Sequence, residues 1–153
     1  MLLIISIIVF TVSLLIFIVN KGIPNSISES YYVLGEGKLI SSLFTWFCWI
    51  VGGTLLPYWI DYLNTDIDLL PFVACGGLMF VGTATLFKGH EKKIHFISAI
   101  ICFASTYIWL LLYSNIFLVL TSVLALALTS VLANKKIFWL EVIAFVTIYI
   151  GLL

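Results

Sequence analysis

The side chains best able to do chemistry are one carboxylate and one histidine. Glu141 is the only acidic residue clearly inside an apolar segment, where a carboxylate is costly and usually has a partner. His95 is the best candidate partner, because the sequence places it at a similar depth from the same side of a predicted membrane. Such a pair can relay protons or orient a nucleophile. The alternative is that Glu141 reaches the inner membrane–water interface and pairs with Lys135 or Lys136.

The connection after the first apolar segment is the most polar stretch of the chain. It reads Pro24-Asn25-Ser26-Ile27-Ser28-Glu29-Ser30, and loops of this kind often carry function. Ser28 or Ser30 could cap a short interfacial helix that runs to Gly35. Alternatively, the loop contributes to a site on the same side as the histidines. The candidate polar cluster is then Ser28, Glu29, Ser30, His90, His95 and Glu141.

Polar residues also follow one face of a predicted helix over Ile94–Leu112. They recur every three or four residues, which places them on a single helical face: His95, Ser98, Cys102, Ser105 and Trp109. Interhelical hydrogen bonding explains such a stripe, and serine can also bond back to its own helix. The functional alternative is a polar pathway along Ser98, Cys102 and Ser105.

A stripe of small residues marks the segment Ile116–Ala133. It is formed by Thr121, Ala125, Thr129 and Ala133, one every four residues. Small residues at this spacing let two helix backbones approach closely. The stripe is therefore a candidate helix–helix seam, either inside the chain or between two copies of it.

The sequence predicts no cofactor and no metal site. Two histidines, five residues apart, are too few for a zinc hydrolase. The three cysteines, Cys48, Cys75 and Cys102, lie in apolar runs without a CxxC pair, so we interpret them as buried packing residues. Nucleotide-binding, zinc-protease and serine-hydrolase motifs do not occur.

These residues must be positioned by helices in a membrane. Of 153 residues, 63% are hydrophobic and only 9% are charged, whereas soluble domains carry about 25% charged residues. Six segments approach the roughly 20 residues that cross a bilayer as helix. They are Leu2–Val19, Leu39–Ile60, Leu69–Phe87, Ile94–Leu112, Ile116–Ala133 and Ile137–Leu153. The predicted fold is an all-α bundle of six transmembrane helices forming a single domain over residues 1–153.

Charge is sorted between the connections. All seven lysines fall in alternate connections, over residues 20–38, 88–93 and 134–136, whereas Asp61, Asp66 and Asp68 share another. The positive-inside rule then places the lysine-bearing loops in the cytoplasm and both termini outside. We expect a multi-pass protein of a bacterial inner membrane. Trp46, Trp49, Tyr107 and Trp109 fall deeper in the segments, and we expect them between helices.

Two short motifs carry a resemblance. The loop Pro24-Asn25-Ser26-Ile27-Ser28-Glu29 and the helix start Ile94-His95-Phe96-Ile97-Ser98-Ala99 resemble uncharacterised small membrane proteins of Bacteroidetes. More distantly, they resemble the Frag1/DRAM/Sfk1-type six-helix proteins, which have a Pro-x-Ile-Ser-Asp-like loop and a His-x-x-x-Ala helix start. This chain has one extra loop residue and Glu in place of Asp. The resemblance loosely implies a lipid-linked or membrane-organising role.

Three functions remain open from the sequence. The leading one is a small transporter, channel-like or membrane-organising bundle without enzymatic activity. The second is a membrane-embedded lipid-modifying enzyme with a cytoplasmic-side Ser/His/Glu site, and the third is an accessory subunit of a membrane complex. The expected partners are membrane lipids and further copies of the chain. A net charge of zero without a basic stretch gives no nucleic-acid partner.

Overall fold

The protein is all-α in the part of the chain that the structure describes. The computed structural model covers residues 1–28, 38–63, 69–87 and 90–153, with the backbone alone at 20–21, 38–41, 63 and 85. The elements, in order, are α1 (Leu2–Lys21), α3 (Lys38–Leu63), α4 (Leu69–Thr83), the 3-10 helix η1 (Ala84–Leu86), α5 (Glu91–Tyr113), α6 (Ile116–Leu132) and α7 (Lys136–Gly151). Each predicted segment coincides with one of the six α-helices in the described ranges, to within four residues at either end.

Local sequence explains where several helices begin and end. Gly22 ends α1 in a left-handed conformation, with φ of 77°, and its N–H donates to the Ile18 carbonyl at 2.8 Å. Glycine adopts this conformation without a steric penalty. Asn115 caps α6, since its side-chain oxygen accepts from the Phe117 N–H at 2.9 Å. Pro71 sits in the first turn of α4, where its missing N–H costs nothing.

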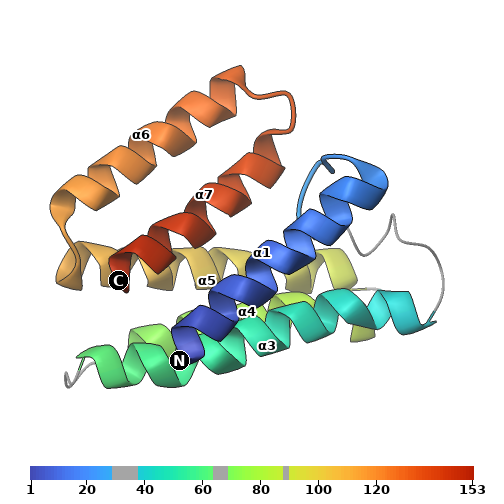
Figure 1. The fold of residues 1–153 in the computed structure, drawn as a ribbon, viewed down its shortest axis with the longest axis horizontal. Coiled ribbons are helices and arrows are strands. Elements are labelled where there is room, and N and C mark those ends of the chain that lie inside the picture. Colours follow the sequence, from blue (N-terminus) through green and yellow to red (C-terminus); the bar gives the residue numbers. More distant parts are fainter. Residues whose placement is uncertain (29–37, 64–68, 88–89) are drawn as a thin grey trace.

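The helices form two groups. Helices α1, α3, α4 and α5 pack in chain order, each on the next, and α6 and α7 form a hairpin beside them (Figure 1). Helix α6 lies at the outer edge and packs mainly on α7. The very short connections before and after α6 predict antiparallel neighbours, and the α6–α7 hairpin fits that expectation.

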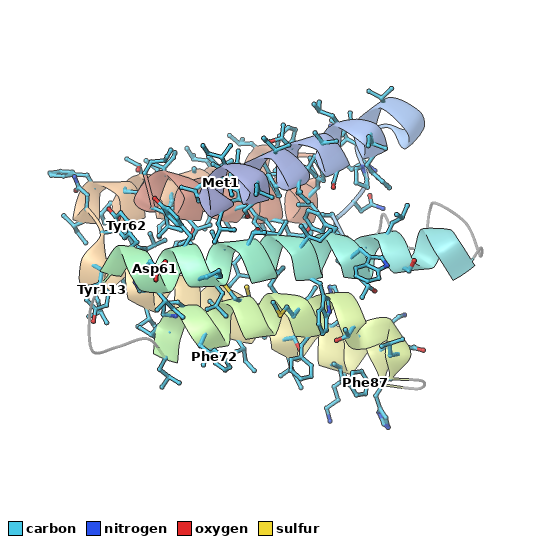
Figure 2. The ribbon with its side chains drawn as sticks, turned by 60° about the horizontal axis from the view of Figure 1, so that its bottom comes forward. Met1, Asp61, Tyr62, Phe72, Phe87 and Tyr113 are labelled. Carbon is cyan, nitrogen blue, oxygen red and sulfur yellow. The ribbon has the colours of Figure 1, made fainter. Side chains whose placement is uncertain are left out.

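Both ends of the chain lie toward the same end of the bundle (Figure 1). Asp61, Tyr62 and Tyr113 mark that end, and Phe87 marks the opposite one, beside the start of α5 (Figure 2). The described lysines at the start of α5, Lys92 and Lys93, therefore belong to the end opposite Asp61.

The outer surface is strongly apolar. Three helices are long and apolar enough to cross a membrane, over Leu2–Val19, Ser42–Tyr62 and Glu91–Tyr113. Trp46 and Trp49 are 62% and 48% exposed, so the prediction that they lie between helices is wrong for these two. Trp109, with no exposed surface, does pack inside. Apolar content alone could not reveal that these two rings face outward.

Candidate functional site: a cavity between four helices

A cavity of about 80 Å³ lies in the middle of the bundle, between α3, α4, α5 and α7. Each helix contributes residues three or four positions apart, which is the repeat of one helical face. On α5 this face runs from His95 to Thr106, or about 16 Å at 1.5 Å per residue. The cavity is therefore bounded along the bundle by four inward faces.

The carboxyl, imidazole and serine groups of the cavity gather at one end. Glu141, His95 and Ser28 all line it, and they come from α7, α5 and the connection after α1. Glu141 lies in the second turn of α7, and His95 lies in the second turn of α5. Three side chains distant in sequence are thus brought to a common cavity wall.

A short segment of the first connection closes this end. The Ile27 N–H donates to the Glu141 carboxylate, and the Ile27 side chain is only 7% exposed. The neighbouring Asn25 carbonyl accepts from the Phe138 N–H at 2.9 Å, and its side-chain oxygen accepts from Lys135 Nζ at 2.7 Å. We call residues 25–27 the strap, because they tie the first connection to the start of α7.

Glu141 and His95 have separate partners. The carboxylate accepts from the strap, whereas the His95 ring hydrogen-bonds to the backbone of Val81 on α4. Lys135, the predicted alternative partner of Glu141, instead bonds to Asn25. The two candidate groups therefore share a cavity, and their direct coupling stays a prediction.

Thiols and a hydroxyl line the middle of the cavity. Cys48, Cys75 and Cys102 come from α3, α4 and α5, and all three are free. Cys102 contacts the Thr106 side chain one turn later and the backbone of Leu78. Sulfur atoms accordingly appear near the centre of the bundle in Figure 2. No cluster of three or more metal-binding side chains occurs within the described ranges.

Aromatic rings form much of the remaining wall. Phe44 and Phe47 on α3 have centroids 6.1 Å apart, and Phe47 and Phe145 have centroids 6.4 Å apart. At the far end Trp59 packs edge-on against Trp109 at 5.0 Å. Both indole N–H groups are buried, and within the described chain neither has a hydrogen-bond partner.

The remaining residues of the predicted polar cluster lie elsewhere. His90 is exposed and precedes the first residue of α5. Glu29 and Ser30 lie outside the described residues, as does most of the predicted interfacial helix up to Gly35. Ser28 Oγ lies 3.0 Å from Ser26 Oγ. Of the six predicted members, the structure brings together Ser28, His95 and Glu141.

The predicted polar pathway is only partly in the cavity. Ser98 and Ser105 are each 7% exposed, so the stripe does face inward. Cys102 lines the cavity, but Ser98 and Ser105 are not part of its wall. The Ser98 backbone instead lies against Gly77 of α4. Thr106, one residue beyond Ser105, lines the wall where the serines were expected.

The predicted small-residue seam lies on α6. Thr121 is exposed, and its hydroxyl bonds back to the Phe117 carbonyl at 2.8 Å. Ala125, Thr129 and Ala133 are half-buried. Within one copy of the chain, the seam is therefore only partly used.

Sequence reasoning missed most of the wall, including the phenylalanine rings and three residues with separate roles. Ile27 supplies the backbone donor to Glu141, Trp59 ends the cavity, and Thr106 lines its wall. Thr106 carried a signal, since it lies eleven residues after His95, or three helical turns. No sequence pattern points to Ile27, because its contribution is a backbone N–H.

A second cavity of about 250 Å³ lies between α1, α3 and the connection that follows α1. Its wall is almost entirely apolar, and Ile27, Phe44 and Phe47 separate it from the first cavity because they line both. Ser13 is its one hydroxyl among the described residues that form the wall.

Comparison with known proteins gives no relative. No family model, no curated protein and no solved structure matches this chain. Function is therefore inferred from the site itself.

Proposed function

We propose that this chain is an integral protein of a bacterial inner membrane that crosses it six times. The three longest helices meet the length requirement by themselves. Helix α4 and η1 together reach about 28 Å, from 15 residues of α-helix and three of 3-10 helix. Helices α6 and α7 are shorter, at about 24–26 Å, and need local thinning or little tilt. The positive-inside rule orients the lysine-bearing connections to the cytoplasm.

Within this frame, we propose a non-enzymatic, transporter-like or channel-like function, with the inner cavity as the binding site. One observation carries the proposal: Glu141 faces a cavity shared with His95 and Ser28 instead of pairing with the lysines beside it. A carboxyl group in an apolar helix that faces a cavity typically marks a substrate or ion pathway. The resemblance to six-helix membrane proteins at residues 24–29 and 94–99 remains a prediction.

The enzymatic alternative has less support. A nucleophile and its base need to be within about 2.6–3.2 Å of each other. Ser28 is instead hydrogen-bonded to Ser26, and His95 to the backbone of Val81. Glu141, the third group, accepts from the strap. An accessory subunit would require neither the cavity nor the inward carboxyl.

The proposal is tested by asking whether water-borne solutes reach the cavity wall. Cys102 lines the cavity, whereas Ala104 on the same helix faces outward. In a Cys48→Ala/Cys75→Ala background, hydroxyethyl methanethiosulfonate should modify Cys102 in native vesicles, because an aqueous pathway supports the ionised thiol that reacts. Mass spectrometry of the intact protein measures the rate.

The matched control moves the thiol by two positions, with Cys102→Ala and Ala104→Cys in the same background. A lipid-facing thiol should react at least about tenfold more slowly, because it lacks water to ionise it. Equal rates at both positions, or modification of Cys102 only after unfolding in detergent, would contradict a solute-accessible cavity.

A further inference from the structure

The wall of the inner cavity combines aromatic rings with a single carboxylate. Five aromatic residues line it: Phe44, Phe47, Trp59, Phe103 and Phe145. Glu141 is the one acidic residue, and no lysine occurs, among the described residues that form the wall. Ring faces carry negative partial charge and attract cations, most strongly when the cation is desolvated. The rings and the carboxylate therefore both favour a positively charged ligand.

The hydrogen-bond partner of Glu141 stabilises a charged carboxylate only weakly. Its hydrogen bond in the structure comes from a neutral backbone N–H, that of Ile27. A carboxylate in apolar surroundings is stabilised far better by a cation than by an amide. The nearest described lysine in sequence, Lys136, is exposed, and Lys135 is bonded to Asn25. Among the lysines whose side chains the structure describes, none thus supplies the counter-charge.

We propose that this cavity binds a small organic ammonium ion, with Glu141 as its counter-charge and the phenylalanine rings around its apolar part. The inference rests on the proposed function and specifies the ligand class of the same site. A bare metal ion fits poorly, since no group of three ligating side chains gathers within the described ranges. The volume of about 80 Å³ exceeds by several-fold the roughly 10–15 Å³ that one water needs. A compact ammonium with a few carbon atoms suits both size and wall.

The strap lies beside the carboxylate that such a ligand would reach. Ile27 lines both cavities, and its N–H donates to one oxygen of Glu141. A carboxylate has two oxygens and about four acceptor positions, so a cation can bind it while that N–H stays in place. Asn25, which bonds to Phe138 and Lys135, also holds the strap at the start of α7.

Three probes of similar size and shape separate charge from burial. Tetramethylammonium, tert-butanol and pivalate each give one strong methyl signal, so saturation-transfer NMR can follow all three. The protein is held in phosphatidylcholine nanodiscs, and empty nanodiscs give the background. Tetramethylammonium should bind at least about tenfold more tightly than tert-butanol, because it gains both the carboxylate and the rings. Pivalate should bind most weakly.

Single substitutions test which residues cause the preference for tetramethylammonium. Glu141→Gln should remove most of the preference for tetramethylammonium and leave only the part that the rings supply, whereas Glu91→Gln, which removes the same charge outside the cavity wall, should leave the preference unchanged. Phe103→Leu should weaken tetramethylammonium binding about threefold without weakening tert-butanol. The Phe103 variant decides the matter if Glu141→Gln fails to fold.

The outcomes distinguish the two proposals. Equal binding of tert-butanol and tetramethylammonium by the wild-type protein would overturn the ammonium site and leave a cavity for neutral solutes. An undiminished preference for tetramethylammonium in Glu141→Gln would also overturn it. If no probe gave a signal above empty nanodiscs, both the ammonium site and the proposed binding function would fail.

Discussion

Helices α4 and α6 are similar in length and composition but differ in how they pack. Both are short and apolar, with 15 and 17 residues. Helix α4 lies between α3 and α5 and buries seven residues, whereas α6 buries only Val119 and Ser122 and packs mainly on α7. Apolar content therefore does not decide which helix becomes central.

Glycine explains the difference. A Cβ on Gly77 would lie 3.0 Å from both the Cys102 nitrogen and the Ser98 carbonyl oxygen of α5. On the side of α4 that packs against α3, a Cβ on Gly82 would lie 2.6 Å from Cys48 Cβ. The backbone of α4 thus approaches a neighbour on each side. Helix α6 has alanine and threonine in its stripe, and no residue there permits so close an approach.

For the proposed membrane protein, this comparison fits packing among helices in an apolar solvent. Lipid tails are as apolar as leucine, so burial of leucine gives no drive for one helix to leave lipid for another. Van der Waals contact between closely spaced backbones does. The central place of α4 then follows from two glycines rather than from its hydrophobicity.

The largest expected effect comes from filling the α4–α5 contact. Gly77→Ala should destabilise the protein by about 2–3 kcal/mol, because the atoms in its way are backbone and cannot rotate aside. Gly76→Ala is the matched control, since nothing lies within 4 Å of its Cβ position. That variant should be neutral or stabilising by about 0.5–1 kcal/mol. Unfolding in a detergent series measures both, and equal losses would refute the glycine explanation.

An intermediate effect is expected where the α6–α7 hairpin is tied to the other helices. Tyr149 of α7 and Ser6 of α1 are both buried, and their hydroxyls lie 3.0 Å apart. A double-mutant cycle of Ser6→Ala and Tyr149→Phe should give a coupling of about 0.6 kcal/mol, the average for hydrogen bonds between membrane helices, and no more than about 1.7 kcal/mol. Additive losses would mean that other contacts, such as the packing of the Phe10 and Phe145 rings and the bonds of the strap, hold the hairpin.

The smallest effect is expected on α6. Thr121 is exposed and bonds only to its own helix among the contacts described for its hydroxyl. Thr121→Leu should therefore change unfolding by no more than about 0.5 kcal/mol. Size-exclusion chromatography with light scattering sharpens the test, because a changed oligomeric state with unchanged stability would identify α6 as a contact between copies. A loss as large as that of Gly77→Ala would remove the contrast between the two helices.

Helix positions could be predicted because a bilayer-length apolar run is an unambiguous signal. The inward face of α5 could also be predicted, since the Ser98, Ser105 and Trp109 spacing follows the helical repeat and all three are buried. Helix rotation elsewhere could not. Trp46 and Trp49 look like core residues by size, yet apolar side chains gain little by turning inward when the solvent is also apolar.

The candidate site was only partly predictable for the same reason. Glu141 and His95 stand out in the sequence because polar side chains are rare in apolar helices. Both line the inner cavity. The strap does not stand out, because its contacts to Glu141 and Phe138 use main-chain atoms that every residue has. The central glycines were visible in the sequence, but their neighbours depend on which helices meet.

The bond between Ser6 and Tyr149 joins residues 143 positions apart. During synthesis the ribosome releases α1 long before α7, so the Ser6 hydroxyl stays in the nascent chain without its eventual partner. Helix α1 can pack on α3 earlier, but its contact with α7 is consequently a late event in biogenesis. A ribosome stalled before residue 149 would hold an α1 whose Ser6 hydroxyl still lacks Tyr149.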